Sequence, residues 1–153
     1  MTTIEPPVDV IERAHGRSRL ALHHLRAGDG GNGQPLLLLH GLGEQTPASA
    51  PGHVAAWPGP VYGLDLTGHG RSTHPIGGGY SAAVLMADVD AALAHLGTAT
   101  ILGRGLGAYI GLLIAGGRPA EVRGVILADG PGLAGGGERP ASPTILTPEP
   151  THA

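Results

Sequence analysis

The residues that could do chemistry gather first at 101–111, where an apolar run turns sharply into a helix-like segment. Glycines at 103, 105 and 107 match the turn Gly-x-Ser-x-Gly, in which a strained backbone exposes a serine hydroxyl for attack on a carbonyl carbon. Gly105 stands where that pattern has its nucleophile. Because glycine has no side chain, neither an acyl nor an alkyl enzyme can form there. The strand-to-helix turn, or elbow, that includes Gly103, Arg104 and Gly107 is therefore predicted to lack a nucleophilic side chain.

Further polar residues come directly after other apolar runs. His40 and Gly41 follow four leucines, and Asp129 follows the run 122–128. In open sheets of parallel strands, ligands bind where the strands end at their carboxyl termini. We therefore expect these residues to share one edge of the sheet with the turn at Gly105.

The elements that must position these residues alternate between strands and helices. Such alternation predicts an α/β fold, a mostly parallel sheet with flanking helices. The apolar run 36–39 is typical of a strand buried on both faces. Four prolines between 44 and 60 allow only a short or broken helix there. The predicted elements are an edge hairpin within 10–26 around a turn at 16–18, strands at 36–39, 61–66, 98–102 and 122–128, a helix capped by Ser81 and ended by Gly97, and a helix at 106–115.

The length of 153 residues fits one domain, with hydrophobic residues at 41% and charged residues at 14%. This balance favours folding, because disordered chains combine low hydropathy with high charge. Glycine and proline dominate the end of the chain. We predict a flexible N-terminus at 1–9, a folded core at 10–133 and a disordered tail at 134–153.

Charge and composition also argue against several functions. A net charge of −3, with basic residues spread along the chain, predicts no binding of nucleic acid or of an anionic membrane. The first twenty residues lack the apolar core of a signal peptide, so a cytoplasmic location is expected. Without cysteine, and without histidines at metal-ligand spacing, the sequence predicts no metal and no cofactor.

In order and spacing, the motifs from 10 to 133 resemble the α/β-hydrolase superfamily of esterases, lipases, epoxide hydrolases and related enzymes. The run Asp65-x-x-Gly68-His69-Gly70-x-Ser72 matches a turn signature that is structural in the family. His40 and Gly41 match the oxyanion loop. The resemblance implies that the backbone N–H groups of Leu42 and Leu106 would stabilise an oxyanion.

Some assignments have two readings. The resemblance offers Asp129 as a triad acid, yet an aspartate before Gly-Pro is equally an ordinary turn former. Arg104 could contact an anionic ligand, or it is simply an exposed arginine. His40 could polarise a substrate, but the resemblance favours a hydrogen-bonding anchor of its loop.

The resemblance covers the first half of the family pattern, and a cap, the last strands and a late histidine are not matched. His152 is the only late histidine, and it does not follow a strand. The sequence thus predicts an impaired or truncated hydrolase acting on esters or similar small apolar molecules. The alternative is a non-catalytic module that binds a small molecule, or that joins a partner or a second copy through the edge strand at 122–128.

A third interpretation uses the glycines differently. Gly103-x-Gly105-x-x-Ala108 also fits a dinucleotide-binding fingerprint, with Asp129 placed for a ribose hydroxyl. This hypothesis does not account for His40 and Gly41 or for the turn signature at 65–72.

Overall fold

The computed structural model describes residues 7–12, 18–28, 33–78 and 80–132. The strands are β1 Val8–Glu12, β2 Arg19–Arg26, β3 Leu36–Leu39, β4 Val61–Leu64, β5 Ala99–Arg104 and β6 Val122–Ala128. The helices are α1 Ala82–Leu96, α2 Leu106–Gly117 and a single 3₁₀ turn, Gly52–Val54.

These strands form one sheet in the order β1-β2-β4-β3-β5-β6. The β1–β2 and β2–β4 pairs are antiparallel, whereas β4–β3, β3–β5 and β5–β6 are parallel. The predicted edge hairpin and the mostly parallel sheet are both confirmed. The turn predicted at 16–18 falls largely on residues outside those that the structure describes.

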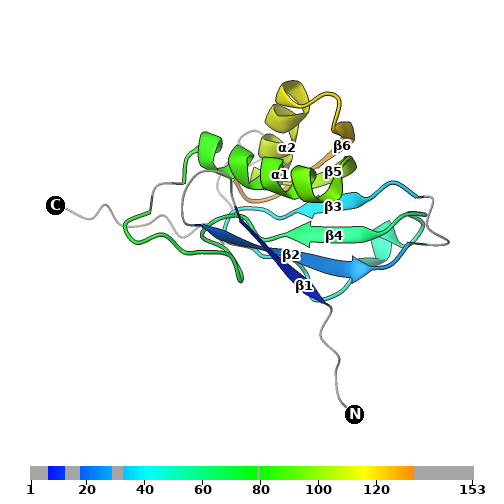
Figure 1. The fold of residues 1–153 in the computed structure, drawn as a ribbon, viewed down its shortest axis with the longest axis horizontal. Coiled ribbons are helices and arrows are strands. Elements are labelled where there is room, and N and C mark those ends of the chain that lie inside the picture. Colours follow the sequence, from blue (N-terminus) through cyan, green and yellow to red (C-terminus); the bar gives the residue numbers. More distant parts are fainter. Residues whose placement is uncertain (1–6, 13–17, 29–32, 79, 133–153) are drawn as a thin grey trace, which may run out of the picture.

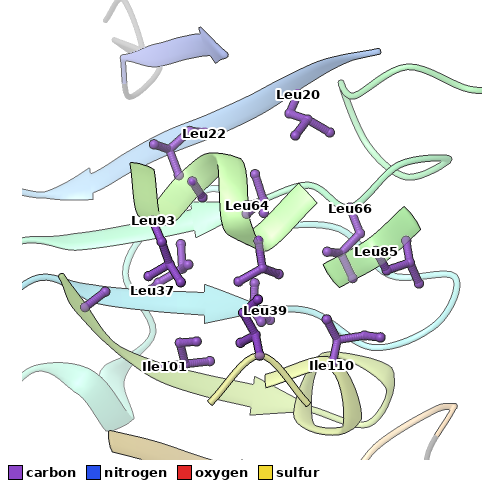
Figure 2. Packing of buried hydrophobic residues seen from close by; sticks show 14 of the residues in the cluster. Leu20, Leu22, Leu37, Leu39, Leu64, Leu66, Leu85, Leu93, Ile101 and Ile110 are labelled. Atoms are coloured by element: carbon purple, nitrogen blue, oxygen red, sulfur yellow. The ribbon is translucent and has the colours of Figure 1, made fainter. Parts of the chain in front are cut away.

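Both long helices lie on one side of the sheet, as Figure 1 shows. Side chains alternate between the two faces of a strand, so the buried strand β3 supplies two separate cores. Leu37 and Leu39 pack with α1 and α2 in the larger cluster, while Leu36 and Leu38 pack on the opposite face near Val54. Figure 2 shows leucine and isoleucine side chains of the larger cluster between strands and helices. Burial on both faces, predicted from the run of four leucines, is confirmed.

Helix α1 begins and ends where its sequence signals predict. The hydroxyl of Ser81 accepts a hydrogen bond from the N–H of Val84, and Gly97 follows the last turn with a φ of 87°. Two strand ends differ from prediction. Strand β4 ends at Leu64 instead of residue 66, because the N–H of Leu66 donates to the ring of His40 instead of to a strand. Strand β5 continues to Arg104, which pairs with Ala128 of β6.

The structure describes only part of the two terminal segments predicted from the sequence. Strand β1 begins at Val8, inside the segment 1–9 for which flexibility is predicted. The predicted tail at 134–153, with His152, lies outside the described residues. Neither long helix of the described ranges has the length and apolar character to span a bilayer.

Candidate functional site

The turn between β5 and α2 places Gly105 in a conformation that side chains rarely adopt. Its φ is 57° and its ψ is −117°, and its N–H donates to the carbonyl of Ala128 at 3.0 Å. A positive φ of this kind strains any residue that carries a Cβ. The backbone therefore has the sharp strand-to-helix turn that the glycine pattern predicts.

Close packing at the start of α2 explains a second glycine. A Cβ on Gly107 would overlap the carbonyl oxygen of Leu39 in β3. The N–H of Gly107 also donates to the carbonyl of His40 at 3.1 Å. The helix thus begins in direct backbone contact with the end of the neighbouring strand, which brings two strand-end loops together.

Two backbone N–H groups from these loops converge on one oxygen. The N–H of Leu42 and the N–H of Leu106 donate to the carbonyl oxygen of Pro131 at 3.0 and 2.9 Å. Leu42 belongs to the loop after β3, and Leu106 is the first residue of α2. Two fixed donors aimed at one oxygen can stabilise negative charge that develops on a carbonyl oxygen. The structure therefore brings together two of the sequence-predicted site residues.

The buried ring of His40 holds the first of these loops. Its Nε2 accepts from the N–H of Leu66 at 3.0 Å, which leaves the proton on Nδ1 to be donated to the carbonyl of Gly41 at 2.8 Å. Burial lowers the pKa of His40 below its usual 6.5, because desolvation outweighs the hydrogen bond to Gly41. Both ring nitrogens are engaged within the loop, which favours the anchoring role over a catalytic one.

A second histidine supports the same loop. Nε2 of His69 accepts from the N–H of Gly43 at 3.0 Å, and its Nδ1 donates to the carbonyl of Thr67 at 3.1 Å. Its ring centroid lies 4.7 Å from that of His40. The loop that carries Leu42 is thereby connected to the turn after β4.

Asp65 connects the remaining segments around the site. Its carboxylate accepts from the N–H of Thr46 at 2.9 Å, the N–H of Arg71 at 2.9 Å and Nε2 of His23 at 2.8 Å. Burial raises the pKa of this carboxyl, but these hydrogen bonds outweigh burial and hold the pKa below 3.8. Ser72 completes the turn by donating to the Asp65 carbonyl and accepting from the N–H of Ala21. These contacts give the turn signature a structural role.

Arg104 is paired with groups of its own chain. Its Nε donates to Glu44 at 2.9 Å, and one terminal nitrogen donates to the carbonyl of Asp129 at 3.1 Å. Glu44 in turn accepts from the N–H of Gly41 at 2.9 Å. Arg104 therefore connects the loop after β3 to the segment after β6.

The exposed carboxylate of Asp129 is part of a local turn. Its Oδ1 accepts from the N–H of Gly130 at 2.9 Å. Among the residues placed by the structure, no histidine forms an ion pair with it, although a triad acid needs such a partner. This geometry favours the turn-forming interpretation.

The N–H groups that begin α2 are engaged within the chain. Those of Gly105 and Gly107 donate to the carbonyls of Ala128 and His40. A dinucleotide phosphate would need these donors at the helix N-terminus. The arrangement therefore disfavours the dinucleotide-binding hypothesis.

A cavity of about 240 Å³ lies beside the two strand-end loops. Its lining is mainly apolar and includes Leu38, Thr46, Pro47, Leu102 and Arg104. A space of this size suits a small apolar group. Within the part of the chain that is placed, no three histidine or acidic residues gather as a metal site.

Sequence reasoning missed Pro131 and Glu44. Pro131 contacts the site through its backbone carbonyl, and no residue type signals such a contact in a sequence. Glu44 lies four residues after His40, but its partner Arg104 is distant along the chain, so only the folded sheet brings the two together.

No family model matches the chain. Several solved structures share its fold. A thioesterase domain from the curacin biosynthetic pathway is 27% identical with a TM-score of 0.65, and the match covers 80% of this chain and 45% of that one. A probable hydrolytic enzyme from Pseudomonas aeruginosa is 25% identical with a TM-score of 0.67, over 80% of this chain and 41% of that one.

Epoxide hydrolase A from Mycobacterium thermoresistibile is 24% identical with a TM-score of 0.61, over 80% of this chain and 38% of that one. This chain spans less than half the length of each of these three structures.

Proposed function

The chain is related to the α/β-hydrolase superfamily over most of its length, and we propose that it is an impaired member of this hydrolytic lineage. In this proposal it binds the carbonyl group of an ester or a similar small apolar molecule. Hydrolysis through the site is slow or absent.

Gly105 is the observation that carries the proposal. It lies at the turn between β5 and α2 with the backbone angles of a strained elbow, and it offers no hydroxyl, thiol or carboxylate. Removing the nucleophile of a serine hydrolase lowers turnover by a factor on the order of 10⁶.

The proposed binding groups are the N–H groups of Leu42 and Leu106, held by the loop of His40 and Gly41. Their convergence on one oxygen supports this role. In enzymes, one such donor contributes about 3 to 4 kcal/mol to stabilisation of a transition state. Asp129 is no longer favoured as an acid, because its carboxylate serves a local turn.

Hydrolysis of p-nitrophenyl butyrate tests the proposal. We compare the wild type with Leu42→Pro, which removes the N–H donor, and with Leu42→Ala, which keeps it. All three are expected to hydrolyse the ester at rates within about twofold of one another. A wild-type rate about tenfold or more above that of Leu42→Pro, retained in Leu42→Ala, would show that the site turns over.

A second candidate function uses strand β6. Among the described strands it pairs only with β5, and its side chains Ile126 and Leu127 are 50% and 51% exposed. An exposed apolar edge favours pairing with another strand. In this candidate, β6 pairs with β6 of a second copy. Light scattering would then give a dimer that Leu127→Lys dissociates, whereas a wild type that stays monomeric at high concentration contradicts it.

The remaining sequence-based expectations belong to the same proposal. They are a small-molecule ligand, no nucleic-acid or membrane partner, and a cytoplasmic location.

A further inference from the structure

The site's two donors are already occupied by the chain itself. The carbonyl oxygen of Pro131 lies 3.0 Å from the nitrogen of Leu42 and 2.9 Å from that of Leu106. Pro131 follows β6, so this carbonyl comes from a third segment that lies over the turn at Gly105. A carbonyl bound in this way has the same donors that a substrate carbonyl would need.

The surrounding backbone leaves little room around this segment. A Cβ on Gly105 would overlap the Pro131 oxygen and would lie 2.6 Å from the carbonyl carbon of Gly130. A Cβ on Gly132 would lie 2.9 Å from the Cβ atoms of both Leu42 and Leu106. The segment 130–132 therefore could not keep its present position if residue 105 carried a nucleophilic side chain.

The side chain of Arg104 holds the residue that precedes the segment 130–132. Arg104 donates to the carbonyl of Asp129 at 3.1 Å while its Nε is paired with Glu44 at 2.9 Å. Because Glu44 also accepts from the N–H of Gly41, the same group of contacts holds the segment and the donor loop.

We propose that the carbonyl of Pro131 is the resident ligand of the site, and that an external carbonyl or carboxylate oxygen binds only after residues 130–132 move away. The inference builds on the proposed carbonyl site. Gly105 then has a second role, since its missing side chain is what lets the segment close. The apparent affinity for an external ligand is then reduced in proportion to the fraction of molecules in which the segment is open.

Amide hydrogen exchange measured by NMR on the whole chain tests the closure. In the wild type, one opening event exposes both donors, so the N–H groups of Leu42 and Leu106 should have equal protection. In Gly105→Ala, the added Cβ displaces the Pro131 carbonyl, and both amides should exchange at least about tenfold faster. The amide of Ile101, in the middle of the sheet, should keep its protection.

Gly116→Ala is the matched control, because a Cβ at this helical glycine meets nothing within 4 Å. It should leave the exchange of both amides unchanged. Arg104→Ala provides a second variant that adds no strain at the turn, and it should also speed exchange at both amides. Fast exchange of both amides in the wild type, or unchanged exchange in both Gly105→Ala and Arg104→Ala, would overturn the closure.

Sodium butyrate, the sodium salt of the acid that the test ester releases, probes binding of an external ligand. It should shift the amide signals of Leu42 and Leu106 more strongly in Arg104→Ala than in the wild type. Equal shifts in the two proteins would overturn the claim that the segment excludes this ligand, and no shift in either protein would overturn the claim that the opened site binds it. Neither experiment depends on turnover, so ester hydrolysis that requires the N–H of Leu42 would contradict the proposed function and leave the closure to be judged on exchange alone.

Discussion

Replacing Asp65 with asparagine removes a charge and one acceptor atom from the centre of the loops that form the site. Its carboxylate is 2% exposed and accepts three hydrogen bonds, one on Oδ1 from Thr46 and two on Oδ2 from Arg71 and His23. An asparagine side chain has one acceptor oxygen and one NH₂ donor. If its oxygen keeps the two donors on the Oδ2 side, its NH₂ faces the N–H of Thr46.

The expected loss of stability follows from this count. One buried N–H, that of Thr46, loses its partner, and an unpaired buried group costs about 1 to 3 kcal/mol. The other two hydrogen bonds lose the charge of their acceptor, and charge-assisted bonds are roughly twice as strong as neutral ones. We expect Asp65→Asn to lower the free energy of unfolding by about 2 to 4 kcal/mol at pH 7.

The pH dependence provides an independent test. The folded pKa of Asp65 lies below its usual 3.8, so the unfolded chain takes up a proton first as pH falls. The wild type therefore loses this stabilisation below about pH 3.8, by up to about 1.4 kcal/mol per pH unit. Asp65→Asn should lack that part of the slope.

Urea unfolding followed by circular dichroism measures both effects. Asp129→Asn is the matched control, because its exposed side chain accepts one hydrogen bond from Gly130 that an asparagine oxygen can also accept. It should unfold like the wild type. If Asp65→Asn changes the free energy of unfolding by less than about 0.5 kcal/mol at pH 7, the Asp65 carboxylate does not stabilise this turn.

Three further predictions concern the same framework. Burial lowers the pKa of His40 below 6.5, so the free energy of unfolding, measured in urea, should fall as the pH drops below 6.5, by up to about 1.4 kcal/mol per pH unit. His40→Gln should remove that contribution. Gly107→Ala should lower the free energy of unfolding by several kcal/mol, because its Cβ would overlap the carbonyl of Leu39. The control Gly116→Ala, at an exposed position of α2, should leave the free energy of unfolding unchanged or raise it by up to about 1 kcal/mol. Ser81→Ala removes the 3.3 Å cap of α1 and should lower the thermal midpoint, with a loss of about 0.5 to 1 kcal/mol; an unchanged midpoint would contradict the capping role.

Local sequence signals accounted for most of the framework. The four leucines of β3 predicted a strand buried on both faces, and Ser81 and Gly97 predicted the ends of α1. These signals act within a few residues, so they can be read without the fold. The spacing of the glycines at 103, 105 and 107 also predicted the turn, although the atoms that leave no room for a Cβ at 105 and 107 belong to the distant residues Pro131 and Leu39.

Contacts between distant segments were not predictable in this way. Strand β4 ends early because Leu66 donates to the His40 ring 26 residues away. Asp88 is fully buried in α1, where it accepts from the N–H and hydroxyl of Thr67. Pro131 occupies the site through its backbone carbonyl, a group that every residue carries. The sequence therefore contained no sign that this residue would do so.

Two hydrogen bonds to the carbonyl of Pro131 close the site in this structure. NMR couplings across hydrogen bonds can detect them in the whole chain, with ¹³C in the Pro131 carbonyl and ¹⁵N in the amides of Leu42 and Leu106. We predict that both amides couple to the Pro131 carbonyl, just as the N–H of Gly107 couples to the carbonyl of His40. If the Gly107 coupling is seen but neither amide couples to Pro131, the site is not closed by its own chain.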